Sequence, residues 1–208
     1  MCDYHSLVAT LHRFAEESRR RPLTLGEALD SLDEAAYALI AIILVLPFLQ
    51  PVPLGPFTVL GGLVFVTLGW QVLRGHESPV LPAKLREITL STATWGLIIK
   101  ACLRLIGFCR KFTKPRYQGL ISGRKGQKVA GFILLAAGLL MAIPFGILPF
   151  NNMLPGLAIL FYGIAELEDD GLMIFVAWFW LIITVIYFTA FFVALWYFGN
   201  EALKHFHW

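Results

Sequence analysis

The uncharged polar side chains best placed to bind a ligand lie in two proline-rich interruptions of otherwise apolar sequence. Gln50 and Thr58 lie within the first interruption, and Asn151 and Asn152 lie within the second. A buried amide or hydroxyl group is costly unless it forms a hydrogen bond. These four residues therefore either satisfy backbone groups that the prolines leave unpaired, or line a polar cavity that binds a substrate between the two interruptions.

Acidic residues gather where the apolar segments meet polar sequence. Four precede the first apolar run and four follow the second: Glu27, Asp30, Asp33 and Glu34, then Glu166, Glu168, Asp169 and Asp170. In one interpretation they end the apolar segments and pair with a basic loop. In the other, a carboxylate couples proton movement to transport, and the candidates are Asp33, Glu34 and Glu166. These three lie nearest the apolar arms, where burial would raise a carboxylate pKa.

We find no pattern typical of an enzyme or of a metal site. No Cys/His pair, glycine-rich phosphate loop or nucleophile elbow is present. The three cysteines suggest neither a disulfide framework nor a ligand cluster. No histidine lies in a hydrophobic segment; the five are His5, His12, His76, His205 and His207. The sequence therefore predicts no enzymatic activity, no cofactor and no bound metal.

The composition is that of an integral membrane protein. Of 208 residues, 58% are hydrophobic, whereas a soluble domain is about 45–50% apolar. Of 17 Lys and Arg residues, four precede Pro22, twelve lie between Arg74 and Lys128, and one follows. Because basic residues collect in short cytoplasmic loops, we expect the N-terminus and the middle of the chain to be cytoplasmic.

The prolines predict two broken helical hairpins, because proline cannot donate a backbone hydrogen bond and disfavours helical geometry in the preceding residue. We assign the breaks to Pro47, Pro53 and Pro56 in the first hairpin, residues 25–73, and to Pro144, Pro149 and Pro155 in the second, residues 129–167. The apolar arms are shorter than the roughly 20 residues of a full span. Re-entrant hairpins fit these lengths best, and pairs of short complete spans are the alternative. Broken backbone at membrane depth must be covered by protein or line a water-filled cavity.

The remaining segments complete a single all-α membrane domain over residues 1–208. Residues 1–22 carry a cytoplasmic amphipathic helix, which lies either on the lipid surface or against the protein's own cytoplasmic face. Residues 74–128 form a basic cytoplasmic loop, in which Trp95 to Phe112 is an amphipathic helix at the lipid interface. Residues 171–199 form a C-terminal transmembrane helix.

Two shorter motifs predict local structure. Thr24 and Glu27, in TLGE, have the spacing of a capping box at a helix N-terminus. The segment SGRKGQK, residues 122–128, predicts a polar turn before the second hairpin.

The two hairpins have the pattern of an internal repeat. Placing Pro47-Phe48 on Pro144-Phe145 brings Gly61 onto Gly156 and Gly69 onto Gly163 when one or two gaps are allowed. The distribution of basic residues puts both hairpins on the cytoplasmic side, as a parallel repeat. An inverted repeat would require the segment from Trp95 to Phe112 to cross the membrane.

The same segments resemble a known family. The motif GEALDSL, the LPF…PVPLGP interruption, the segment IPFGILPFNNMLPGLAIL and the ending ELEDDG are similar to those of the ExoD family of bacterial exopolysaccharide-synthesis membrane proteins. The resemblance covers roughly residues 23–194. It implies a multi-pass protein of the bacterial inner membrane that is needed for normal exopolysaccharide production. It implies no assigned reaction and no catalytic residues.

Broken helices paired by a repeat favour a small transporter or flippase-like carrier of an anionic or lipid-linked substrate. The alternative is a non-transporting scaffold of the polysaccharide assembly machinery. The expected partners are membrane lipids, including anionic and polyprenyl-phosphate lipids, other exopolysaccharide-synthesis proteins and a second copy of the chain. No nucleic acid is expected.

Overall fold

The structure, a computed structural model, describes residues 4–21, 24–32, 35–51, 54–76, 78–80, 83–87, 89, 91–111, 113–144 and 148–206. These residues form helices and connecting turns, and no strand occurs among them. The helices are α1 (Tyr4–Arg20), α2 (Leu25–Asp30), α3 (Ala35–Val45), α4 (Pro56–Leu73), α5 (Ala83–Arg86), α6 (Thr92–Cys109), α7 (Gly123–Ala142), α8 (Met153–Glu168) and α9 (Gly171–Phe206). Two short 3-10 turns, η1 (Leu46–Phe48) and η2 (Gln118–Leu120), join them.

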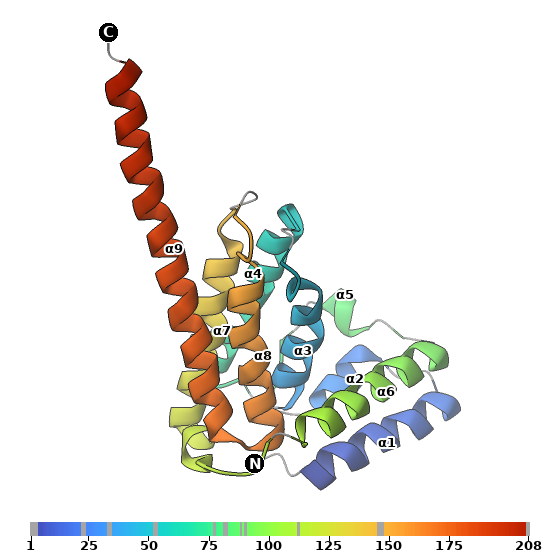
Figure 1. Cartoon of the computed structure of the whole chain (residues 1–208). Coiled ribbons are helices and arrows are strands. Elements are labelled where there is room, and N and C mark those ends of the chain that lie inside the picture. The colour runs from blue at the N-terminus through green and yellow to red at the C-terminus, as the bar shows by residue number, and fades with distance from the viewer. Residues whose placement is uncertain are drawn as a thin grey trace.

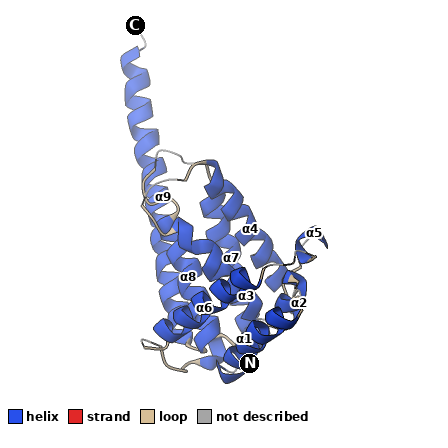
Figure 2. Ribbon diagram, turned by 90° about the vertical axis from the view of Figure 1, so that its right-hand side faces the viewer, coloured by secondary structure: helices blue, strands red, loops and turns tan. Residues whose placement is uncertain are grey.

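Helices α3, α4, α7 and α8 form a bundle along which α9 lies (Figure 1). Three helices in the described part of the chain are long and apolar enough to cross a membrane: Pro56–Leu73, Gly123–Ala142 and Gly171–Tyr197. The chain is therefore an all-helical protein with the composition and helix lengths of a membrane protein. Helix α9 continues well past the end of the bundle, and its C-terminal part has no neighbouring helix in either view (Figures 1 and 2).

Helix α7 begins earlier than the sequence predicted. Residues 123–128, expected in a polar turn, form its first turns, so that α7 has 20 residues. Arg124, Lys125 and Lys128 are exposed, and long basic side chains can reach water from the end of a membrane helix. The prediction that the apolar arms are too short to span was therefore wrong for α7 and for α4, which has 18 residues, because both are long and apolar enough to cross a membrane. Each hairpin joins one of these long arms to a shorter one, α3 with 11 residues or α8 with 16.

The prolines lie at the helix ends. Helix α3 ends at Val45, and Pro47 follows in η1. Pro56 occupies the first turn of α4, where its missing N–H is not needed. In the second hairpin Pro144 follows α7, Pro149 lies in the turn, and Pro155 lies in the first turn of α8. Pro53 lies outside the described residues.

The two long arms pack very closely because glycines line their contact. A Cβ atom added at Gly69 would lie 2.5 Å from the backbone nitrogen of Leu135 and 2.7 Å from the carbonyl oxygen of Gly131. One added at Gly62 would lie 2.5 Å from the nitrogen of Ala142 and 2.7 Å from the carbonyl oxygen of Gly138. Small residues of this kind allow membrane helices to approach backbone to backbone. The short arms α3 and α8 pack against each other on the other side of the bundle.

Helices α1 and α6 form a layer against the lower part of the bundle (Figure 1). Leu11 and Phe14 of α1 are buried with Trp95, Ile99 and Cys102 of α6, in one cluster with residues of α3. The apolar stripe of α1 thus covers the protein's own surface, the second of the two alternatives. The stripe of α6 that was expected to face lipid is also occupied by protein.

The predicted capping box is confirmed at the start of α2. The Glu27 backbone N–H donates to Thr24 Oγ1 at 3.2 Å, and the Thr24 N–H donates to the Glu27 carboxylate at 3.1 Å. Arg21 also bonds Glu27, at 2.8 Å, which ties the end of α1 to α2. Ala28 of α2 belongs to the same buried cluster as the α1 and α6 residues.

Candidate functional site

The two proline-rich breaks meet at one end of the bundle. We call them the first tip (residues 46–55) and the second tip (residues 143–152). The backbone N–H of Phe150 donates to the carbonyl of Pro51 at 3.4 Å, which links the tips directly. Tyr187 Oη of α9 donates to the carbonyl of Pro149 at 2.7 Å. The second tip therefore lies beside the middle of α9, and both tips lie at the end of the bundle toward which the C-terminus of α9 points (Figures 1 and 2).

A cleft of about 320 Å³ opens between the two tips. It is lined by Gly55, Pro56, Thr58, Val59, Ile143, Pro144 and Asn151. The structure thus brings together two of the four predicted binding residues, Thr58 from the first hairpin and Asn151 from the second. Asn152 is adjacent to Asn151 and more deeply buried, whereas Gln50 is exposed and does not line the cleft.

Polar groups beside the cleft are buried without partners in the described structure. Thr58 is 3% exposed, and its Oγ1 has no hydrogen-bond partner among the described residues. Asn152 is 1% exposed, and neither its Oδ1 nor its Nδ2 has a partner among them. Each such group costs about 1–3 kcal/mol in an otherwise apolar site. A ligand or ordered water that bonds to these atoms would recover that free energy.

Two helix N-termini point to the same place. Helix α4 begins at Pro56, and helix α8 begins at Met153, directly after the asparagine pair. The N-terminus of a helix carries a partial positive charge. The N–H of Thr58 in α4 donates to the Gly55 carbonyl at 3.1 Å, and those of Leu154 and Gly156 in α8 donate to backbone carbonyls at 3.1 and 2.9 Å. No charged side chain is among the described residues that line the cleft. The cleft therefore offers uncharged hydrogen-bond donors and the partial positive charge of helix N-termini. These groups suit the binding of an anionic oxygen, although the described residues supply no cationic side chain there.

The candidate coupling carboxylates lie elsewhere. Glu166 is near the far end of α8, about 21 Å along the helix axis from Asn152. It lines a small cavity with Tyr37, Val72, His76, Ile121, Gln127, Ala130 and Tyr162. The cavity volume of about 20 Å³ is sufficient for one water molecule. The structure therefore separates Glu166 from the cleft, and Asp33 and Glu34 lie outside the described residues.

The acidic ending of α8 is tied to the basic loop. Asp170 is 0% exposed and accepts hydrogen bonds from Arg116 Nε at 2.9 Å, Leu172 N at 3.0 Å and Lys114 N at 3.2 Å. The Gly171 N–H donates to the carbonyl of Arg116 at 2.8 Å. Pairing with the basic loop was one predicted role of the acidic cluster. The sequence did not single out Arg116, because no local pattern marks a partner so distant along the chain.

Glu168 beside this ion pair is also buried. Its Oε2 accepts a bond of 3.4 Å from Thr113 Oγ1, and its Oε1 is buried with no partner among the described residues. Burial raises the pKa of the Glu168 carboxyl group, opposed by the nearby positive charge of Arg110 and by the Thr113 bond. Glu168 thus has the perturbed environment that we expected of Asp33, Glu34 and Glu166.

Comparison with known proteins identifies relatives along nearly the whole chain. A family model described as "Exopolysaccharide synthesis, ExoD" matches residues 7–190. The chain is 30% identical to Protein ExoD of Rhizobium meliloti (strain 1021) over 203 residues, which are 97% of this chain and 83% of that protein. No solved structure matches.

Proposed function

Because the chain belongs to the ExoD family of exopolysaccharide-synthesis proteins, we propose that it acts in that synthesis as a small carrier. In this proposal it is a multi-pass protein of the bacterial inner membrane and moves an anionic or lipid-linked substrate. The observation that carries the proposal is the cleft between the tips, where the buried hydroxyl of Thr58, without a partner among the described residues, lies in the first turn of α4. The buried amide of Asn152, next to the cleft-lining Asn151, directly precedes α8. Discontinuous helices that present N-termini to an anion are the recurring binding element of membrane carriers.

The packing of the short arms supports an internal repeat, the architecture from which many carriers are built. Gly156 and Gly163 of α8 have the spacing of the α4 glycines and face α3. A Cβ atom added at Gly156 would lie 3.3 Å from a methyl group of Val45, and one at Gly163 would lie 3.2 Å from the carbonyl oxygen of Ala38. Helix α8 therefore turns its glycines toward α3 as α4 turns its glycines toward α7, although the nearest α3 atom to Gly163 is a side-chain atom, Ile42 Cγ1 at 2.5 Å, rather than backbone.

The correspondence extends to individual residues. The offset that superposes the two Pro-Phe dipeptides also places the α3 contact residues, Val45 and Ala38, on Ala142 and Leu135 of α7. In this comparison of contacts, Gly156 corresponds to Gly62, whereas the sequence alignment had matched Gly156 with Gly61. Exchange of the two hairpins by an approximate twofold axis would produce this pattern of contacts, with both tips at one end.

The length of α9 supports tips that end inside the bilayer. From Gly171 to Tyr187, which bonds the second tip, α9 rises about 25 Å. Trp196 and Tyr197 lie about 14 Å further along the helix and suit the far membrane interface. The tips would then stop short of that interface, as in re-entrant hairpins. On one side of the tips the broken backbone is covered by protein, and on the other side it faces the cleft.

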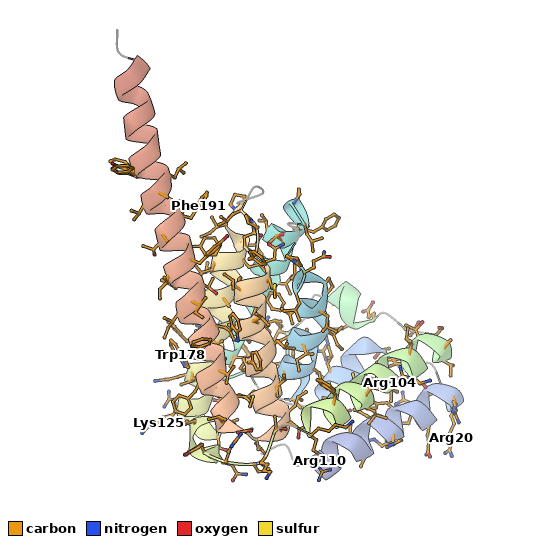
Figure 3. All side chains as sticks on the ribbon, viewed as in Figure 1. Arg20, Arg104, Arg110, Lys125, Trp178 and Phe191 are labelled. Atoms are coloured by element: carbon orange, nitrogen blue, oxygen red, sulfur yellow. The ribbon has the colours of Figure 1, made fainter. Side chains whose placement is uncertain are left out.

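The basic residues support an orientation. Arg20, Arg104, Arg110 and Lys125 all lie toward the end of the bundle opposite the tips (Figure 3). With that end cytoplasmic, as the positive-inside rule requires, the cleft opens into the periplasmic leaflet. In an otherwise cysteine-free protein, Leu54→Cys should react with a membrane-impermeant thiol reagent from the periplasmic side. Asn151→Cys should react more slowly from the same side, because Asn151 lines the cleft but is only 3% exposed. Labelling from opposite sides would contradict the arrangement.

Isosteric removal of the buried hydroxyl tests the function. Thr58→Val should abolish exopolysaccharide production in a strain lacking the chromosomal gene, while insertion and thermal stability are kept or improved, because an unpartnered polar atom is removed. Thr67→Val is the matched control, since Thr67 is an exposed residue of the same helix whose hydroxyl bonds the Val64 carbonyl. Full production by Thr58→Val would refute a carrier that uses this cleft.

A scaffold is the second candidate, and the exposed basic side chains of the opposite end favour it. It would dock other components of exopolysaccharide synthesis through that surface. Charge reversal at Arg104, Arg110 and Lys111 should then abolish production, and Thr58→Val should leave it unchanged. The carrier predicts that Thr58→Val is the more damaging change.

A further inference from the structure

A second concave surface lies between α1 and α6, at the opposite end of the molecule from the tips. It is an open groove of about 530 Å³. His12 and Arg19 line it from α1, and Lys100 and Arg104 line it from α6, with Ile99 and Leu103 between them. We call it the α1–α6 groove. It shares no residue with the cleft between the tips.

The charge in the α1–α6 groove is entirely positive. Arg19, Lys100 and Arg104 are exposed, and none of them forms an ion pair with another described residue. No carboxylate is among the described residues that line the groove. Glu16 lies on the same face of α1, four residues after His12 and three before Arg19, but is not part of that lining. Glu17, on another face of α1, is engaged by Arg13 and Arg21. Three like charges at one surface repel one another, and an anion between them would remove that repulsion.

Apolar residues accompany the charges. The groove is floored by Ile99, which is buried, and by the half-buried Leu103. On the outer face of α6, Leu97 and Phe108 are exposed by 70% and 61%. Leu97, Lys100, Arg104 and Phe108 recur at three- or four-residue intervals and so share one stripe of α6. A soluble anion would use only the cations, whereas an amphiphile would use both kinds of residue.

We propose that the α1–α6 groove binds the phosphate headgroup of an anionic membrane lipid. Arg19, Lys100 and Arg104 hold the phosphate, and the acyl chains lie against Leu97 and Phe108. The layer of α1 and α6 lies beside the lower halves of α3 and α8, with which it shares a buried cluster. With the basic end cytoplasmic, that is the depth of the inner-leaflet headgroups. This site is independent of the proposed carrier activity, because it lies at the other end of the bundle.

Native mass spectrometry of the purified full-length protein in a neutral detergent tests the site. The probes are short-chain phosphatidylglycerol, short-chain phosphatidylcholine and inorganic phosphate. We expect saturable binding of phosphatidylglycerol and none of the other two. The variant Arg19→Gln/Lys100→Gln/Arg104→Gln should bind phosphatidylglycerol roughly 100-fold more weakly, and Lys100→Gln alone about fivefold more weakly.

The matched control is Arg124→Gln/Lys125→Gln/Lys128→Gln, which removes the same charge from exposed positions of α7. It should bind phosphatidylglycerol within about threefold of the unaltered protein, because headgroup attraction falls off within a Debye length. Equal weakening by both triple variants would overturn the proposal in favour of non-specific charge. Binding of inorganic phosphate as tight as that of the lipid would overturn it in favour of a soluble anion. All six replaced residues are exposed, so unchanged unfolding temperatures are expected for both variants.

Discussion

A single methyl group added at Gly69 should weaken the pairing of α4 and α7. Its carbon would lie 2.5 Å from Leu135 N and 2.7 Å from the carbonyl oxygen of Gly131, whereas ordinary contacts begin near 3.4 Å. Both neighbours are backbone atoms, so no side chain can rotate away. Helices α4 and α7 must therefore separate by about 0.9 Å, a gap that forfeits a quarter to a half of each dispersion contact it opens.

The magnitude follows from overpacking and helix propensity. Overpacking of a close contact costs about 1–3 kcal/mol. Gly96 is the matched control, because it is helical and a Cβ atom there would meet nothing within 4 Å. Gly96→Ala should therefore gain up to about 1 kcal/mol from propensity. The same propensity gain applies at Gly69 and cancels, so the two variants should differ by about 1–3 kcal/mol, or roughly 2–12 °C in unfolding temperature for a chain of this size.

The assay is thermal unfolding of the purified variants in the same detergent. Gly131→Ala provides a graded intermediate, because the nearest atom to its added carbon would be a side-chain atom, Leu73 Cγ at 2.7 Å, with the carbonyl oxygen of Gly69 at 2.9 Å. The expected order of stability is Gly96→Ala, then Gly131→Ala, then Gly69→Ala. If Gly69→Ala unfolds at the temperature of Gly96→Ala, the two long arms do not pack as closely as described.

Three other changes should have measurable effects. Asp170→Asn should lower stability by about 2 kcal/mol, because the buried carboxylate loses its charge beside Arg116; an unchanged unfolding temperature would contradict a structural role for the pair. Burial raises the pKa of Glu168, so the stabilising contribution of its protonated form is complete below the unfolded-state pKa and is lost as pH rises through the folded-state pKa. Lowering the pH from 7 toward 5 should therefore stabilise the protein, and Glu168→Gln should flatten that slope; an identical slope in the variant would exclude this carboxyl group as its source. Thr24→Ala should cost about 1 kcal/mol through loss of the cap, seen as faster proteolysis between α1 and α2, and no change in cleavage would argue against the capping box.

Local sequence chemistry predicted the features that depend on neighbouring residues. Proline removes a donor and constrains the residue before it, so helix ends near Pro47, Pro56 and Pro144 follow from the sequence alone. The capping box of Thr24 depends on a contact three residues away and was equally predictable. To predict that Thr58 and Asn151 line one cleft, it was sufficient to assume that the two hairpins lie side by side with their tips together.

Tertiary contacts decided the features that the sequence did not predict. The stripes of α1 and α6 suit lipid and protein equally well, and only the fold shows that they face each other. Arg116 is one of seventeen basic residues, and nothing near it in the chain identifies Asp170 as its partner. The early start of α7 was missed because Arg124, Lys125 and Lys128 resemble a turn until their exposure at a helix end is known.

The unequal lengths of the bundle and α9 have a consequence for the surrounding lipid. The bundle extends about 25 Å along α9, whereas the apolar segment Gly171–Tyr197 is about 40 Å long. In the proposed re-entrant arrangement, lipids around the exposed part of α9 keep their full thickness, whereas those above the tips meet a protein surface that ends inside the bilayer. Such hydrophobic mismatch is relieved by local thinning of the membrane. The protein would thus deform the leaflet directly above its own cleft and shorten the distance that a polar headgroup must travel through hydrocarbon.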